Sequence, residues 1–309
     1  MSEPVLVLDR LKKTFGDFTA VHEMSLTVPR GSVYGFLGPN GAGKTTTLRM
    51  TLAIYAPTSG SISILGRPSA LEVRDRIGYL PEEKGLYKKM TGRDIIAYFA
   101  SLKGMKGRDA RVRAGELLDK YGLGEFKDRK CEALSKGMGQ KVQVLASIAH
   151  RPEFVIFDEP FSGLDPVNQQ VLEDVIRDLQ RDGTTIIFST HIMEHAERLC
   201  DRLVLIARGR KLFDGTVTEA RRMIPRRLII QTQVNPEALR HVAGVTGLRA
   251  LGKDDKFEVT LAEGADADRV LAACFQNGIS LRSFDRSEPN LRDVFLKLVG
   301  AEDAEEVLS

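Results

Sequence analysis

Short apolar runs alternate with amphipathic segments along the first two thirds of the chain. The runs Val33–Leu37 and Phe154–Phe157 are apolar on every side, as strands in the middle of a parallel sheet are. The segments Arg93–Leu102 and Arg111–Tyr121 carry apolar residues at helical spacing, and Gly122 follows the second. Strands that alternate with helices predict an α/β fold built around a mostly parallel sheet.

The same pattern assigns most of the other segments before residue 220. Further strands are predicted at Val5–Leu8, Ser25–Val28, Ser61–Leu65, Thr184–Ser189 and Leu203–Ala207. Further helices are predicted at Ser135–Ala149, Val167–Gln180 and Ile192–Cys200. Because two consecutive amphipathic helices interrupt the alternation, we expect a helical insert at about residues 91–150 within the α/β core.

The pattern changes near residue 216. Thr216 and Glu219 have the spacing of a capping box that opens a short helix, and the basic, Pro-containing segment 221–227 has the composition of a linker. The segments that follow are predicted as strand 228–233, helix 236–243, strand 245–251, strand 256–262, helix 266–277, strand 279–285 and helix 290–299. This is the order of a split βαβ sandwich with an added helix. We therefore predict a first domain at 1–222, a small α+β domain at 226–300 and a solvated acidic tail at 301–309.

A glycine-rich loop joins the Val33–Leu37 strand to a predicted helix, and it reads Gly-x4-Gly-Lys-Thr. Its glycines let successive N–H groups turn inward around an anion, and the helix N-terminus adds roughly half a positive charge there. Lys44 adds a full charge, and Thr45 offers a hydroxyl oxygen to Mg²⁺. An ordinary Gly-rich turn is the alternative, but the strand before and the helix after the loop favour a triphosphate site. Its predicted residues are Gly38, Pro39, Asn40, Gly41, Ala42, Gly43, Lys44, Thr45 and Thr46.

Candidate catalytic groups follow two later strands. Asp158 and Glu159 end the Phe154–Phe157 run. Beside a P-loop, Asp158 would lie next to Mg²⁺ and Glu159 would polarise the attacking water. The alternative is that Asp-Glu-Pro only forms a turn after the strand, but the P-loop earlier in the chain favours the catalytic role. His191 ends another predicted strand, where it can donate a hydrogen bond to the terminal phosphate. We assign structural or exposed positions to the other histidines, His22, His150, His195 and His241.

Composition indicates an ordinary globular protein. Among the 309 residues, 42% are hydrophobic and 28% charged, and a net charge of +3 gives no sign of a nucleic-acid partner. No apolar run approaches the ~18–20 residues that span a bilayer, and the N-terminus lacks the features of a signal peptide. The three cysteines are widely spaced, which predicts reduced thiols. We expect a cytosolic chain of about two domains.

These motifs, in this order, resemble those of the ATP-binding subunits of ABC transporters over about residues 5–220. The resemblance identifies Gly38–Thr46 as the Walker A loop and Phe154–Glu159 as the Walker B strand with its catalytic glutamate. It implies that His191 is the switch histidine and that Asp165 lies in the D-loop. By the same resemblance, Lys44 takes part in catalysis and adenine stacks on Phe15.

Two positions depart from the usual pattern of that family. The usual signature Leu-Ser-Gly-Gly-Gln is replaced by Leu-Ser-Lys-Gly-Met at Leu134–Met138. Ser135 and Gly137 remain to contact the γ-phosphate of a neighbouring subunit, while Lys136 either attracts phosphate or, as we favour, points to solvent. Glu82 stands where the family has the Q-loop glutamine and keeps a carboxylate oxygen for Mg²⁺. Both variants, and the C-terminal domain, are similar to the sodium-extrusion and related exporter ATPases.

The resemblance implies an ATPase that uses ATP and Mg²⁺ as a homodimer or with a paired ATP-binding subunit. Integral-membrane permease subunits would dock at the cytoplasmic face on the helical insert and the Glu82–Tyr87 region, and transport would be export. The alternative is a soluble ABC-type ATPase switch, although the sequence lacks a long coiled-coil insertion and a second cassette. Residues 226–300 would act as a ligand sensor or as a structural addition. Nothing in the sequence indicates the transported substrate.

Overall fold

The computed structural model describes residues 3–83, 85, 87–252 and 255–300, so the predicted tail lies outside the described residues. The chain forms two compact units, the first ending at Thr216 and the second beginning at Val217. The short helix α7 (Val217–Arg222), predicted to close the first domain, packs instead against α9 (Leu291–Val299). The units therefore divide at residue 216 rather than 222, because the buried face of α7 finds its partner in α9.

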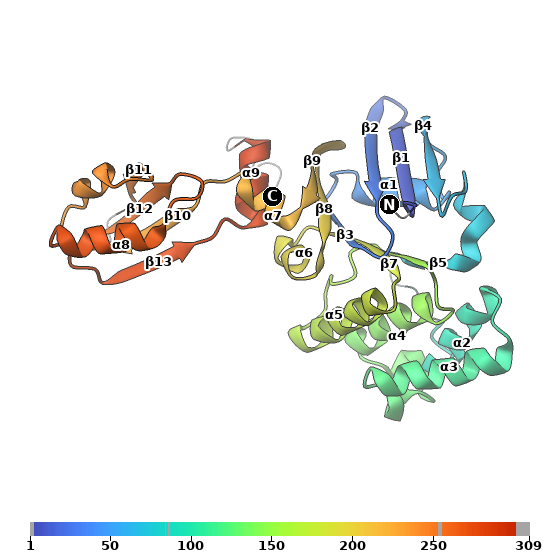
Figure 1. Ribbon diagram of the computed structural model, residues 1–309. Helices are drawn as coiled ribbons and strands as arrows, with labels where there is room; N and C mark the ends of the chain where they lie inside the picture. Colours follow the sequence, from blue (N-terminus) through green and yellow to red (C-terminus); the bar gives the residue numbers. More distant parts are fainter. Residues whose placement is uncertain (1–2, 84, 86, 253–254, 301–309) are drawn as a thin grey trace. The chain divides into compact units, whose positions relative to one another are not determined.

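The first unit is built on a six-stranded sheet in the order β5-β6-β7-β3-β8-β9 (Figure 1). Its strands are β3 (Val33–Leu37), β5 (Ile77–Leu80), β6 (Phe154–Phe157), β7 (Thr185–Thr190), β8 (Arg202–Ala207) and β9 (Arg210–Thr216). All neighbours run parallel except β8 and β9, which confirms the predicted sheet. The two strands that the apolar pattern did not predict, β5 and β9, are its edges.

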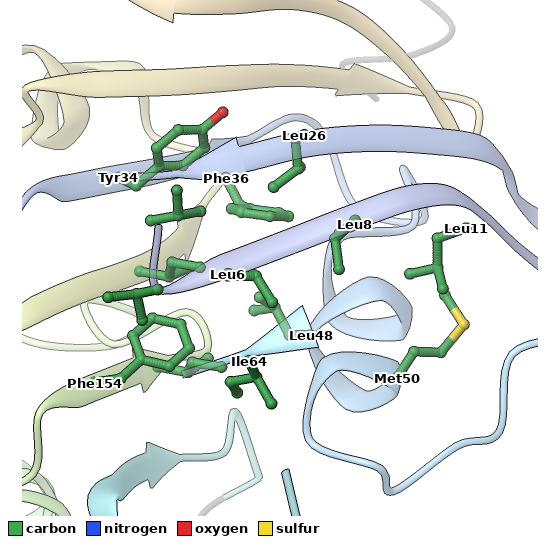
Figure 2. Packing of buried hydrophobic residues seen from close by; sticks show 14 of the residues in the cluster. Leu6, Leu8, Leu11, Leu26, Tyr34, Phe36, Leu48, Met50, Ile64 and Phe154 are labelled. Carbon is green, nitrogen blue, oxygen red and sulfur yellow. The ribbon is translucent and has the colours of Figure 1, made fainter. Parts of the chain in front are cut away.

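A three-stranded antiparallel sheet packs together with α1 (Lys44–Thr51) over the central sheet. Its order is β2-β1-β4, from β1 (Leu6–Phe15), β2 (Phe18–Val28) and β4 (Ser59–Ile64). Side chains of both sheets and of α1 form one buried cluster, in which Leu6, Leu48 and Phe154 are fully buried (Figure 2). This cluster holds the start of α1 against the end of β3.

Helices α2 to α5 lie on the other side of the central strands (Figure 1). They are α2 (Gly92–Leu102), α3 (Gly107–Lys120), α4 (Lys136–Ile148) and α5 (Pro166–Arg181), and α6 (Met193–Leu199) follows β7. Short 3-10 helices lie at Ala70–Arg76, Gly124–Phe126 and Cys131–Ala133. Helices α2, α3 and α4 pack on one another as the predicted insert. Among the described residues, no helix combines the length and the apolar character needed to cross a membrane.

The second unit contains a four-stranded antiparallel sheet in the order β11-β12-β10-β13. Its elements are β10 (Arg227–Gln231), β11 (Val245–Ala250), β12 (Lys256–Leu261), α8 (Ala267–Gln276) and β13 (Ser283–Ser287), besides α7 and α9. This strand order is that of the predicted split βαβ sandwich. The helix predicted at 236–243 is only a 3-10 helix, Glu237–His241, and it ends early because Val242 is already extended.

Glu153, just before β6, ties three segments of the first unit together. Its carboxylate accepts hydrogen bonds from Arg76 Nε at 2.5 Å and Nη2 at 2.9 Å, and from Arg30 Nη1 at 3.1 Å. These bonds, those of Arg76 first, lower the pKa of Glu153 to about 2 from its ordinary 4.5. Because the pKa in the folded state is the lower one, the ionised carboxylate stabilises the fold above pH 4.5, and this contribution is lost as the pH falls toward 2.

We predict that Glu153→Gln lowers the free energy of unfolding of the first unit by about 1 kcal/mol at pH 7, a modest value because the pair is partly exposed. Urea unfolding of both proteins as a function of pH should show the difference shrinking below pH 4.5. Glu116→Gln, which removes a single long surface contact to Arg113, serves as the control and should change little. A difference that stays constant down to pH 2.5 would contradict this role of Glu153.

Candidate nucleotide-binding site

The loop between β3 and α1 has the geometry of a P-loop. Helix α1 begins at Lys44, and Gly43 before it has φ +98°, a left-handed conformation that favours glycine. Gly38 lies so close to β8 that an added Cβ would stand 2.1 Å from the carbonyl oxygen of Ile206. Asn40 and Gly41 at the tip are exposed. The predicted strand, loop and helix are therefore all present, and the loop requires glycine at both ends.

The side chain of Lys44 lies inside this loop and is only 5% exposed. Its ammonium group donates hydrogen bonds to the carbonyl oxygens of Gly38 at 2.7 Å and Pro39 at 3.1 Å. Its Nζ also lies 3.2 Å from Oε1 of Glu159. The predicted P-loop cation and the predicted catalytic carboxylate thus form a buried ion pair that links the loop to the end of β6.

Asp158 follows β6 and meets the start of α1. Its Oδ1 accepts hydrogen bonds from the Thr45 hydroxyl at 3.1 Å and from the Ser189 hydroxyl at 2.6 Å. Burial raises the pKa of Asp158. Its other oxygen, Oδ2, is buried and has no hydrogen-bond partner within the described part of the chain. A hydroxyl and a carboxylate with a free buried oxygen form a donor set that fits a hard divalent cation such as Mg²⁺.

Glu159 and His191 complete this group of side chains. His191 Nδ1 lies 3.0 Å from Oε2 of Glu159, whose side chain is 7% exposed. Glu159 has φ +47°, a left-handed backbone conformation that is uncommon for a residue with a side chain. The ends of β3, β6 and β7 thus bring Lys44, Asp158, Glu159 and His191 together, as the sequence pattern predicts for a parallel sheet.

Ser189 is a part of the site that the sequence pattern missed. It lies on β7, is fully buried, and bonds to Asp158 Oδ1 and to the backbone N–H of Glu159. A hydroxyl that follows three apolar residues near the end of β7, beside the strand that carries two carboxylates, was the available signal.

A second set of predicted residues lies together elsewhere in the first unit. The Ser135 hydroxyl caps α4 by accepting a hydrogen bond from Met138 N at 3.2 Å. Asp165 caps α5 and accepts two hydrogen bonds from Asn168. Gly137 faces the same Asn168, since a Cβ on Gly137 would lie 2.4 Å from its Nδ2. Among the described residues, no hydrogen bond joins this set to the P-loop.

Two further predicted residues, Phe15 and Glu82, lie at the margins of the site. Lys136 is exposed, in line with the solvent-facing position favoured from the sequence. Phe15, at the end of β1, is 44% exposed and meets Tyr55 edge-on at 5.7 Å between ring centroids. Glu82 is exposed and follows β5, whose Leu80 carbonyl accepts a hydrogen bond from Asp158 N at 2.9 Å. Exposure leaves both side chains accessible to a nucleotide or a metal, and their assigned roles stay predictions.

The site consists of a strand, a P-loop and a helix, and Lys44 and Thr45 at the start of the helix contact the carboxylates of Glu159 and Asp158. This arrangement defines a P-loop nucleotide site. The sequence profile of the ABC transporter family matches residues 21–162, and the profile of the C-terminal domain of DrrA1-3-like ATP-binding proteins matches residues 215–299. The uncharacterized ABC transporter ATP-binding protein YhaQ of Bacillus subtilis (strain 168) is 39% identical over 96% of this chain and 99% of its own.

Nod factor export ATP-binding protein I of Paraburkholderia xenovorans (strain LB400) is 36% identical over 98% of this chain and 99% of its own. A solved ATP-binding subunit of an ABC transporter aligns with a TM-score of 0.66 at 31% identity, over 71% of this chain and 92% of the other. The chain belongs to the family of ABC transporter ATP-binding proteins. It is an ATP-binding and ATP-hydrolysing subunit of an ABC transporter.

We predict that Gly38→Ala weakens ATP binding, because the new Cβ must push the loop away from the Ile206 carbonyl. Overpacking of this kind costs about 1–3 kcal/mol, which corresponds to a loss of affinity of about 5- to 150-fold. Calorimetric titration with ATP measures it. The control is Gly115→Ala in α3, where an added Cβ meets no atom within 4 Å and ATP affinity should not change. Equal affinities of the two variants would contradict the close approach.

Proposed function

We propose that two chains, either two copies of this one or this one with a paired ATP-binding subunit, bind ATP and Mg²⁺ between them, head to tail. The observation that carries this proposal is the separation of the predicted residues into two sets. One set contains the P-loop, Asp158, Glu159 and His191. The other contains Ser135, Gly137 and Asp165, which make no hydrogen bond to the P-loop among the described residues. Each set would supply half of a nucleotide site, with the second facing the partner's P-loop.

The phosphates would lie in the loop from Gly38 to Thr46. Helix α1 begins directly after the loop, at Lys44, so its N-terminus and the free backbone N–H groups of the loop would both favour an anion there. Lys44 would exchange its bonds to loop carbonyls for bonds to the outer phosphates. Phe15, exposed at the end of β1, would offer its ring to adenine. Ser135 and Gly137 of the partner would contact the γ-phosphate from the other side.

Thr45, Asp158 and, as a third ligand, Glu82 would hold Mg²⁺. When bound, the ion would neutralise phosphate charge. Thr45 and Asp158 are already joined at 3.1 Å, and Asp158 Oδ2 is the oxygen left over for a ligand bond. Glu82 is only two residues after Leu80, whose carbonyl oxygen accepts a hydrogen bond from Asp158 N. The segment that carries Glu82 therefore starts beside Asp158.

Glu159 would accept a proton from the attacking water, and His191 would hold Glu159 and the terminal phosphate in line. Both carboxylate oxygens of Glu159 already face positive or hydrogen-bonding groups, Lys44 and His191. Phosphoryl transfer depends mostly on such positioning and on charge stabilisation. The products carry more charge than ATP at the interface, so hydrolysis would release the two chains.

We predict that Glu159→Gln retains ATP binding, lowers ATP turnover by about 10²–10⁴-fold, and traps ATP-bound dimers, because the amide cannot accept the proton. Steady-state phosphate release and light scattering with ATP measure the two effects. Glu194→Gln, an exposed carboxylate on α6, is the matched control and should behave as the wild type. Normal turnover of Glu159→Gln would remove Glu159 from this role.

Transport would require separate integral-membrane subunits, so the chain would work peripherally at the cytoplasmic face of the membrane. An apolar groove of about 410 Å³ lies between β5 and the helical insert, and Tyr79, Ile95 and Phe99 line it. Tyr98 and Tyr87 lie beside Phe99 and are exposed, 42% and 55%. Exposed aromatic groups around a groove mark a docking surface. Export is favoured over import because the relative from Paraburkholderia is named an export protein.

We predict that Tyr98→Asp reduces recovery of the chain with its detergent-solubilised permease by about tenfold, since a charge then replaces a central aromatic. ATP binding by the isolated chain should stay unchanged, because Tyr98 lies on α2 of the helical insert and its ring contacts are with Tyr87 and Phe99. Phe275→Asp, which changes a still more exposed aromatic on α8 of the second unit, is the control. Undiminished co-purification of Tyr98→Asp would place the docking surface elsewhere.

A further inference from the structure

We propose that Ser189 is a positioning residue for ATP hydrolysis, which fixes the carboxylate of Asp158 and the backbone of Glu159 at the same time. This inference rests on the proposed roles of Asp158 as a Mg²⁺ ligand and Glu159 as the base. Ser189 itself would touch neither nucleotide nor metal, since its hydroxyl is fully buried behind both residues.

The hydrogen bonds of Ser189 have only one possible direction. The backbone N–H of Glu159 can only donate, so the Ser189 oxygen, 2.8 Å away, accepts from it. The single hydroxyl hydrogen is then left for Oδ1 of Asp158 at 2.6 Å. One hydroxyl therefore connects the two neighbouring residues that metal binding and water activation need.

The bond to Asp158 determines which carboxylate oxygen is available. Thr45 and Ser189 both donate to Oδ1, which leaves the buried Oδ2 without a hydrogen-bond partner in the described residues. Without Ser189, only the Thr45 hydroxyl would hold the carboxylate, and that hydroxyl is itself a proposed metal ligand. Loss of a hydrogen-bond partner that orients a metal ligand typically lowers metal affinity or activity by about 10- to 100-fold.

The bond to Glu159 supports a strained backbone. Glu159 has φ +47°, a left-handed conformation that is less favourable for a residue with a Cβ than for glycine. Its N–H is held by Ser189, and its carbonyl accepts a hydrogen bond from Ser162 N at 3.2 Å. The left-handed turn directs the Glu159 side chain back toward Lys44 and His191. Loss of the first bond would allow this side chain to leave its position.

The place of Ser189 in its strand also favours a role in the site. The three residues directly before it on β7, Ile186, Ile187 and Phe188, are apolar and fully buried. A buried hydroxyl in such a strand is costly unless both its donor and its acceptor are used. Both are used here, and both partners belong to the proposed catalytic machinery.

The test compares Ser189→Ala and Ser189→Thr with Thr185→Val in the full chain. Thr185 is a fully buried hydroxyl on the same strand, and it accepts a hydrogen bond from Gly31 N at 2.8 Å, away from the site. For Ser189→Ala we expect kcat to fall, and the Mg²⁺ concentration for half-maximal ATP binding to rise, each by about 10- to 100-fold. ATP binding in the presence of EDTA should stay unchanged. Ser189→Thr should restore most of both quantities, and Thr185→Val should change neither.

Three results would overturn the proposal. The first is a Ser189→Ala protein with wild-type kcat and Mg²⁺ dependence, and the second is a Thr185→Val protein with the same losses as Ser189→Ala, which would indicate strand stability alone. The third is no rescue by Ser189→Thr. Should Ser189→Ala not fold, Ser189→Cys takes its place and should show the same losses in part, because a thiol is only a weak hydrogen-bond donor and acceptor. Failure of the proposed function can be distinguished from failure of this inference. Normal turnover of Glu159→Gln would show that Glu159 is not the base, whereas the Mg²⁺ titration of Ser189→Ala would still report on the position of Asp158.

Discussion

The ammonium group of Lys44 imposes the main constraint on the first unit. It carries a charge at a position that is 5% exposed, and a buried charge is tolerated only when it is paired and hydrogen-bonded. The carbonyl oxygens of Gly38 and Pro39 and the carboxylate of Glu159 meet this need. Because these acceptors come from the loop after β3 and from the end of β6, two separate strands must end at the same point in space.

The central sheet meets that constraint by its strand order. Strand β7 lies between β3 and β6, and all three run parallel, so their carboxyl ends form one edge. Ser189 at the end of β7 then connects to Asp158 and Glu159 on one neighbour. Behind this edge, the buried cluster around Leu48 holds α1 in place (Figure 2).

The sequence predicted the parts of this structure in which local pattern and burial agree. The central strands β3 and β6 and the helices α4 and α5 follow from apolar runs and from apolar residues at helical spacing. The edge strand β5 was missed because Gly78 interrupts its short apolar run, and β9 was missed because it is mostly polar. The boundary at Thr216 and the bonds of Ser189 depend on contacts between residues far apart in sequence, which no local pattern carries.

The central claim is that a nucleotide bound at one P-loop is completed by a second chain. The most direct measurement is the structure of the Glu159→Gln variant with ATP and Mg²⁺, together with the paired subunit if the chain does not pair with itself. The account predicts that the Ser135 hydroxyl of one chain lies about 2.6–3.0 Å from a γ-phosphate oxygen at the P-loop of the other. An ATP-bound monomer, or a dimer in which Ser135 faces away from the nucleotide, would contradict it.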